Sequence, residues 1–239
     1  MSAIAALLLT AAQPYPLPPP AQEWQPTARY IAPGQDEPGY RNWYIAAPWH
    51  PAGVKAFNDY LTAWGVGGIV PTWQLLRTAS DWRECGAPAF EIPPAADWPN
   101  IVQTLRYIRD DVIPAVGPVE PVSVYRNPQL NICAGGAPGS AHRYASAIDL
   151  VPLRPTTREA LIHDLCALHA ATGEPYGVGL GFYAFLRFHV DSTRFRKWGF
   201  GNLPEAAPCR NEPPSVTVAQ KPGDSVPAAV PDAEDREPK

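Results

Sequence analysis

Hydrophobic residues recur with the spacing of an α-helix in three segments of the chain. The pattern is clearest in residues 97–113, whose apolar positions step by three or four residues and are Trp98, Ile101, Leu105, Ile108 and Val112. Asp97 is expected to cap this helix at its start, and Pro114 is expected to end it. Similar spacing predicts helices over residues 54–64 and 156–172.

Shorter apolar runs predict β-strands. They lie at residues 119–125, 147–153, 178–182 and 186–191, and a tight turn is expected between the last two. Residues 147–153 are mostly apolar, which is typical of a central strand. Helices followed by strands mixed with helices predict an α+β domain, with a small antiparallel sheet and flanking helices.

Proline changes this picture towards the two ends of the chain. The 239 residues include 31 prolines, many of them before residue 52 or after residue 203. Because proline lacks a backbone donor and fixes φ, such stretches favour extended or irregular chain. The expected organisation is an irregular Pro-rich arm at 13–50, a folded domain at 51–202 and a disordered Pro-rich and charged tail at 203–239.

Residues 1–12 form a short apolar run that ends in small residues. This run is similar to the hydrophobic region and cleavage site of a secretory signal peptide, with an ordinary N-terminal extension as the alternative. It is too short to span a bilayer comfortably, so no transmembrane span is expected. A signal peptide predicts an exported protein, periplasmic or extracellular.

The overall charge and hydrophobicity are those of an ordinary globular protein. Hydrophobic residues make up 46% of the chain, and the net charge is −4. An acidic balance gives no sign of a nucleic-acid surface or a basic membrane patch. We therefore expect no nucleic-acid partner, and we expect a monomer.

The four cysteines are Cys85, Cys133, Cys166 and Cys209. No two of them form a Cys-x-x-Cys pair, which disfavours a cysteine zinc knuckle. In an exported protein an even number is compatible with two disulfides, for which three pairings are possible. Proximity in sequence favours Cys85–Cys133 and Cys166–Cys209, and four buried thiols are the alternative.

Two histidines and an aspartate form a candidate zinc site. His142 follows a glycine-rich loop, Asp149 lies in the apolar run 147–153, and His189 lies in another expected strand. Catalytic zinc commonly takes three such ligands and leaves a fourth position for water. A carboxylate in so apolar a strand needs a partner, which a metal or a buried salt bridge would provide. Asp191 is two residues after His189 and shares its face of the strand, beside the metal or in contact with its ligand.

Three ordered blocks of residues resemble a known family. The first is Ser140-x-His142-x-x-Ala145-x-Ala147-x-Asp149, which resembles the Ser-x-His-x-x-Gly-x-Ala-x-Asp signature of the M15 zinc peptidases. This family comprises D-alanyl-D-alanine carboxypeptidases and murein endopeptidases, and it shares its fold with the hedgehog signalling domain. The second block resembles the YcbK-like branch and comprises Gly179, Gly181, Tyr183, Phe188–Asp191 and Arg196–Trp198. The third is similar to the family's Tyr-Arg-Ser-Pro stretch and comprises Val124–Pro128 with Asn131 and Ala134–Ala137.

The resemblance implies roles for individual residues. It makes His142, Asp149 and His189 the ligands of Zn²⁺ in a hedgehog or DD-peptidase-like domain. It gives Arg126 the task of holding a substrate carboxylate or carbonyl oxygen, which suits a guanidinium, while a structural ion pair is the alternative. Ser140 is expected to orient the loop or a ligand unless it is a plain turn residue. Tyr125 is a further site residue because it belongs to the same block as Arg126.

Two positions depart from the family pattern. Ala145 replaces a glycine, which is a mild change. Leu186 stands where well-studied members carry the Glu or Asp that serves as general base, which leaves Asp191 as the best candidate for the acid–base role.

The resemblance implies a zinc metallopeptidase that hydrolyses peptide stems or cross-links of peptidoglycan, as an endopeptidase or a D,D-carboxypeptidase. The missing base motivates an alternative, a cell-wall-binding module that retains zinc without catalysis. A third possibility has no metal, with Asp149 in a salt bridge to Arg126.

Overall fold

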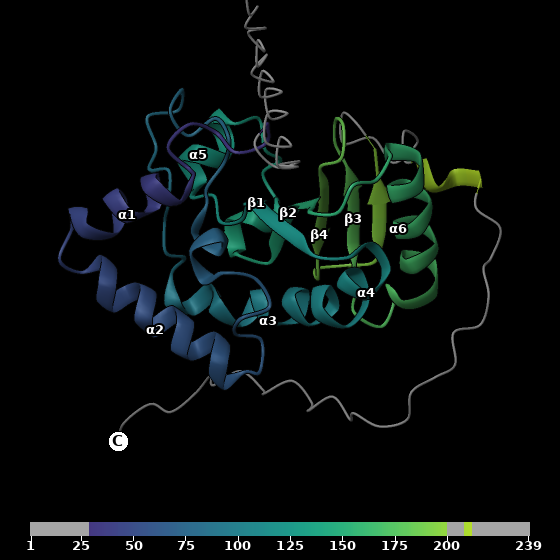
Figure 1. Ribbon diagram of the computed structural model, residues 1–239, viewed down its shortest axis with the longest axis horizontal. Coiled ribbons are helices and arrows are strands. Elements are labelled where there is room, and N and C mark those ends of the chain that lie inside the picture. Colours follow the sequence, from purple (N-terminus) through teal and green to yellow (C-terminus); the bar gives the residue numbers. More distant parts are fainter. Residues whose placement is uncertain (1–28, 200–207, 212–239) are drawn as a thin grey trace, which may run out of the picture.

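The computed structural model describes residues 29–199 and 208–211 (Figure 1). The expected signal peptide at 1–12 lies outside the described residues, as do residues 13–28 of the expected arm. Of the expected tail at 203–239, only a 3₁₀ turn at Pro208–Asn211 is described.

The chain forms a helix, α1, at Glu37–Ala46. The expectation of an irregular arm is therefore wrong for these residues. Asp36 caps the helix, because its carboxylate accepts a hydrogen bond from the backbone N–H of Gly39 at 2.9 Å. The proline of this segment lies in the first turn, where a helix needs no donor. Tyr40 and Trp43 pack α1 against the core.

Two further helices confirm the predictions made from apolar spacing. They are α2, His50–Ala63, which begins before the expected residue 54, and α6, Arg158–Thr172. Phe57 and Leu61 are the buried residues of α2 and lie one turn apart. The side chain of Thr157 caps α6.

The helix predicted at 97–113 is present but longer. It comprises α3, Trp98–Tyr107, a π-turn at Ile108–Val112 and α4, Ile113–Val116, so Pro114 does not end it. The N–H of Ile113 donates to a carbonyl five residues back, and this π-turn directly before Pro114 lets the helix continue through a residue that has no N–H to donate. Asp97 precedes α3 without making a capping hydrogen bond from its side chain.

Five strands form one sheet in the order β1-β2-β4-β3-β5. Their bounds are Val119–Ser123, Ala147–Pro152, Gly179–Phe182, Phe188–Asp191 and Arg196–Trp198 for β1 to β5 in turn. Every residue of β2 is buried, and β2 lies between β1 and β4, which confirms its expected central position.

The expectation of a wholly antiparallel sheet is wrong for one pair of strands. β5 pairs in parallel with β3, whereas the other neighbouring strands are antiparallel. β5 has only three residues and no apolar pattern, so its extended conformation depends on the pairing with β3. β1 also ends at Ser123 rather than at residue 125, and its register with β2 shifts between Pro121 and Ser123.

Helices surround the sheet in this mixed α/β fold. Figure 1 shows α1 and α2 at one side of the molecule and α6 at the other, with the strands between them. One hydrophobic core joins these parts. It includes Leu61 of α2, Leu105 of α3, Leu150 of β2, Leu165 of α6 and Val190 of β4. No helix within the described ranges is long and apolar enough to cross a membrane.

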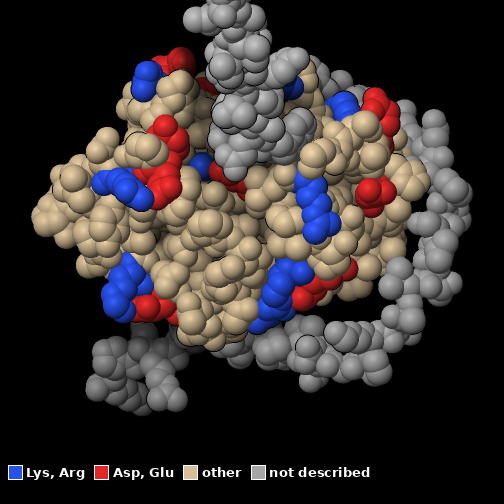
Figure 2. All heavy atoms as spheres, in the orientation of Figure 1, with Lys and Arg blue, Asp and Glu red and all other residues tan. Residues whose placement is uncertain are grey.

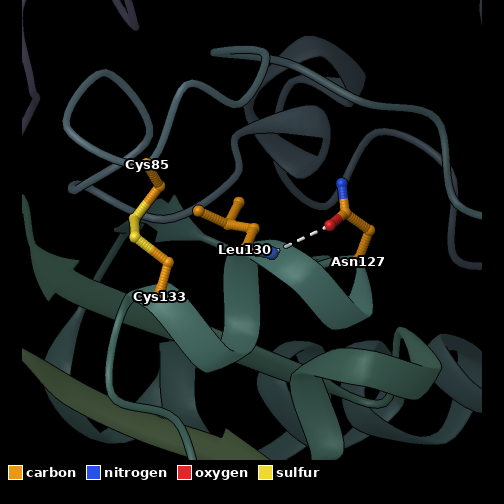
Figure 3. The surroundings of a disulfide bond; sticks show 4 residues. All are labelled: Cys85, Asn127, Leu130 and Cys133. Atoms are coloured by element: carbon orange, nitrogen blue, oxygen red, sulfur yellow. Dashed lines mark hydrogen bonds between the residues drawn. A yellow bond between two sulfur atoms is a disulfide. The ribbon is translucent and has the colours of Figure 1, made fainter.

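Both expected disulfides are confirmed. Cys85–Cys133 ties a loop to the end of α5, Pro128–Cys133 (Figure 3). Asn127 caps the other end of this helix, accepting a hydrogen bond from the N–H of Leu130 at 2.9 Å. Cys166–Cys209 joins α6 to the turn at 208–211. Two disulfides are typical of exported proteins.

Candidate metal centre

Two strands and a turn bring the three predicted ligands together. Asp149 on β2 and His189 on β4 are directly paired across the sheet. His142 lies in a 3₁₀ turn, Ala141–Tyr144, that leads into β2. Ala145, the first residue after this turn, has a φ of 51°, a left-handed conformation that favours glycine. The backbone at Ala145 thus adopts a conformation suited to the glycine that the resembled signature has there.

The three side chains converge on one point. The Nε2 atom of His142 lies 3.2 Å from Oδ1 of Asp149 and 3.2 Å from Nδ1 of His189. The same Nδ1 atom lies 2.9 Å from Oδ1 of Asp149. All three residues are buried, and their possible ligand atoms lie within 4.8 Å of one another.

The outer hydrogen bonds of the two imidazoles indicate which nitrogens face the centre as acceptors. The Nδ1 atom of His142 lies 2.5 Å from the carbonyl oxygen of Val124, so it carries the proton and Nε2 has the free lone pair. The Nε2 atom of His189 lies 3.0 Å from Asp191, so in the neutral ring the proton is on Nε2 and Nδ1 has the lone pair. Two nitrogen lone pairs and a carboxylate oxygen therefore converge. This donor set fits a metal cation.

The second oxygen of Asp149 is held by two arginines. Oδ2 accepts hydrogen bonds from Nη2 of Arg126 at 2.7 Å and from Nη2 of Arg187 at 2.5 Å. The salt bridge between Asp149 and Arg126 is thus present, and it leaves Oδ1 directed at the histidines. A metal and this salt bridge use different oxygens, so one does not exclude the other.

Asp191 lies behind His189. Its Oδ2 atom contacts Nε2 of His189 and accepts from Nη2 of Arg196 at 2.7 Å, while Oδ1 accepts from the N–H of Thr193 at 2.9 Å and from Nη1 of Arg196 at 3.0 Å. His142 and Asp149 contact the imidazole of His189 at Nδ1, whereas Asp191 contacts it at Nε2. The ring of His189 therefore lies between Asp191 and the point where the three ligands converge. This geometry favours the orienting role of Asp191 over the acid–base role.

Burial and neighbouring charges set the ionisation of the cluster. Burial, helped by the charge of Arg126, lowers the pKa of His142 to about 4, so this imidazole is neutral at pH 7. Burial would raise the pKa of Asp149, but His142 and Arg187 hold it well below its ordinary value. Burial also opposes the charged form of His189, yet its hydrogen bonds to Asp149 and Asp191 raise its pKa. The anionic carboxylate and neutral His142 are the forms that bind a metal, whereas His189, with its raised pKa, would release the Nδ1 proton when a metal binds.

A cavity of about 340 Å³ adjoins the cluster through the two arginines. Arg126 and Arg187 form part of its wall, together with Tyr30, Ser80, Asp81 and Tyr183. Leu186 lies in the turn between β3 and β4 and packs against the core. It contributes no ionisable group where the resembled family has its base.

Within residues 29–199, Ser140 and Tyr125 make no hydrogen bond to the side chains of His142, Asp149 or His189. Ser140 precedes the 3₁₀ turn, and its carbonyl accepts from the N–H of Arg143 at 3.0 Å. Tyr125 is buried between Val124 and Arg126. The expected role of Ser140 in orienting a ligand thus has no hydrogen bond behind it in this part of the chain, and neither side chain belongs to the cluster.

Sequence reasoning missed Arg187, and it named Arg196 in the second block without giving it a role. Arg187 is two residues before His189, as Asp191 is two residues after it, so a strand period of two was the available signal for Arg187. Arg196 belongs to β5, whose parallel pairing with β3 brings it beside Asp191.

Comparison with protein-family models, with curated proteins and with solved structures finds no match to this chain. The case for a metal centre therefore rests on the convergence of His142, Asp149 and His189.

Proposed function

We propose that the protein is a zinc-dependent metallopeptidase that cleaves peptide stems or cross-links of peptidoglycan. The observation that carries the proposal is the convergence of two imidazole lone pairs and one carboxylate oxygen in a buried site. Zinc is the metal best suited to two imidazoles and one carboxylate with a further position for water. The hedgehog or DD-peptidase-like fold and the peptidoglycan substrate come from the resemblance of the three sequence blocks.

The bound metal would supply an activated water and polarise the scissile carbonyl. The protein's own groups position the ligands and the substrate. Val124 and Asp191 fix the ring orientation of the two histidines, which is the usual task of such outer partners. Arg126, at the cavity wall, is placed to bind a carboxylate or a developing oxyanion of the substrate.

The site favours an anionic part of the substrate near the metal. Two guanidiniums share the charge of Asp149, and Asp81 lines the same cavity and acts on Arg187, so the excess positive charge near the site would come from the bound metal. A free carboxylate of a peptide stem would balance that charge. An exported protein, periplasmic or extracellular and monomeric, is part of the same proposal, and the two disulfides support export.

A second candidate function is a binding module that retains zinc without catalysis. Leu186 supplies no base, and the oxygens of Asp191 are engaged by His189, Thr193 and Arg196. In this alternative the cavity would hold the peptide without cleaving it.

Digestion of purified sacculi, with mass analysis of the products and zinc analysis of the protein, separates these functions. The peptidase proposal expects about one zinc per chain and released products from the wild type, and neither from His189→Ala. Arg126→Gln is expected to lose most of the activity even when excess zinc fills the site, because Arg126 also holds the ligand Asp149 and its loss alone can weaken zinc binding. Zinc without products would favour the binding module, and a wild type that binds no zinc would refute both.

A further inference from the structure

A groove between α1 and α2 takes no part in the function proposed above. Its volume is about 630 Å³, within the range of roughly 300–1,000 Å³ found for small-molecule sites. None of its lining residues belongs to the metal cluster or to the cavity beside it. The lining includes three aromatic and three neutral polar side chains, which are Tyr40, Tyr44, Trp73, Asn42, Asn58 and Thr72.

The aromatic side chains form a continuous strip. The ring of Tyr40 is centred 5.7 Å from that of Tyr44 and 5.7 Å from that of Trp73, on which it stacks at 29°. The guanidinium of Arg77 lies 4.5 Å from the centre of the Trp73 ring and fixes it further. All three aromatic residues are half-buried, so part of their surface remains open to the groove. The strip is a preformed apolar platform.

Neutral hydrogen-bonding groups accompany the strip. The hydroxyl of Thr72 donates to Oδ1 of Asn58 at 2.6 Å, an arrangement that leaves the amide N–H groups of Asn58 as donors. Asn42 lies exposed on α1. The groove therefore offers amide and hydroxyl groups next to aromatic surface.

The charges at the groove are compensated within the two helices. Arg41 pairs with Glu37 at 2.6 Å, and Lys55 pairs with Asp59 at 2.5 Å, each one helical turn apart. Figure 2 shows the same arrangement over α1 and α2, where blue and red side chains adjoin and the surface between them is uncharged. The groove thus gives a charged ligand no free counter-charge.

We propose that this groove binds a neutral saccharide. A pyranose ring presents an apolar C–H face that stacks on aromatic rings, and hydroxyls at its edge that bond to amides and hydroxyls. Tyr44, which is tilted at 49° to Tyr40 rather than stacked on it, matches the first property at the end of the strip, and Asn42 and Asn58 match the second. An acyl chain would instead desolvate the amides without giving them partners.

Calorimetric titration of the full chain with a tetramer of N-acetylglucosamine and with cellotetraose tests the proposal. Saturable binding of at least one tetramer is expected. Tyr44→Ala should raise Kd roughly tenfold through the lost stacking, and Asn42→Ala should also weaken binding. Trp64→Ala is the matched control, because Trp64 is 49% exposed at the end of α2 and does not line the groove. It should change Kd less than twofold.

Several outcomes would overturn the saccharide proposal. They are no heat from either tetramer at millimolar concentration, an unchanged Kd in both Tyr44→Ala and Asn42→Ala, and tighter binding of a galacturonic acid tetramer than of the neutral tetramers. Circular dichroism checks that each variant is folded. His189→Ala should bind the saccharide as the wild type does, so this result stands or falls separately from the peptidase proposal.

Discussion

At the scale of single residues, Asp149 explains how a fully buried carboxylate can be a metal ligand. A buried charge without partners would be strongly destabilising. Two guanidiniums balance the charge through Oδ2, so Oδ1 stays ionised and directed at His142 and His189. Because these partners belong to the protein, the ligand oxygen is oriented before any metal arrives.

Arg187 should therefore matter for metal affinity even though it is no ligand. Its guanidinium is fixed on three sides, by Asp149 at 2.5 Å, by Ser80 at 3.3 Å and by the ring of Tyr183. Loss of such an outer partner costs about 10- to 100-fold in metal affinity. Arg187→Gln is thus expected to raise the Kd for zinc by that factor, measured by competition with a chelator.

Arg83→Gln is a suitable control, because Arg83 is exposed and its guanidinium contacts the ring of Trp82 and the carbonyl of Pro33, away from the metal cluster. Its Kd for zinc should equal that of the wild type. Equal affinity in Arg187→Gln would show that Arg126 alone suffices to hold Asp149.

The role of Asp191 can be tested with one substitution. If Asp191 orients His189 by accepting a hydrogen bond from the Nε2 atom of the imidazole, Asp191→Asn should weaken zinc binding roughly tenfold. Any peptidase activity lost for this reason should be restored by excess zinc. If Asp191 were instead the general base, zinc affinity would be preserved and activity would stay lost at every zinc concentration. Parallel measurements of zinc Kd and of activity separate the two roles.

At the scale of elements, the spacing of apolar residues was enough to predict a helix or strand where that spacing matches the buried face of the element. Residues 97–113 and 147–153 have unambiguous helix and strand patterns, and the structure confirms both elements. α1 was missed because prolines on either side of it suggested irregular chain, although the capping residue Asp36 was readable. β5 was not readable at all, because a three-residue strand depends on its partner β3.

The site divides in the same way. The three ligands carry their own chemical signal and were predicted. The contacts of Asp149 with Arg126 and of Asp191 with His189 were also anticipated. The further partners Arg187 and Arg196 were missed because they meet Asp149 and Asp191 only through the pairing of strands.

His169 on α6 should make stability depend on pH. It is buried, its Nε2 atom lies 2.9 Å from the carbonyl oxygen of Val178, and its ring stacks on Phe195. Burial lowers the pKa of His169 below its ordinary value of 6.5. The unfolded chain then binds the proton more tightly than the folded one, so the contribution of His169 is complete above pH 6.5 and is lost as the pH falls towards the folded-state pKa.

Urea unfolding at pH 7.5, 6.0 and 5.0 measures this dependence. The free energy of unfolding of His169→Gln should fall less steeply below pH 6.5 than that of the wild type. Identical slopes would mean that His169 does not titrate differently on folding. Val178 and Phe195 are unchanged in this comparison, so the slope reports the imidazole alone.

At the scale of the whole molecule, each disulfide attaches a different peripheral segment to the sheet and its helices. Cys85–Cys133 joins the loop that follows Ser80 and Asp81 to the end of α5, and Ala134 is the next residue after that end. Ser80, Asp81 and Ala134 all line the cavity beside the metal cluster. Cys166–Cys209 attaches the turn at 208–211 to α6, away from that cavity. The first disulfide therefore supports a wall of the proposed substrate site, and the second does not.

Removing each disulfide should separate stability from site geometry. The bridged cysteines are 48 and 43 residues apart, so the double variants Cys85→Ser with Cys133→Ser and Cys166→Ser with Cys209→Ser should lose similar stability, about 2–4 kcal/mol each. Only the first frees the loop whose Ser80 hydroxyl bonds to Arg187. Zinc Kd should therefore rise in that variant and stay near the wild-type value in the other, measured by chelator competition on folded protein beside urea unfolding. Equal zinc affinity in both variants would mean that the loop after Ser80 does not hold Arg187 against Asp149.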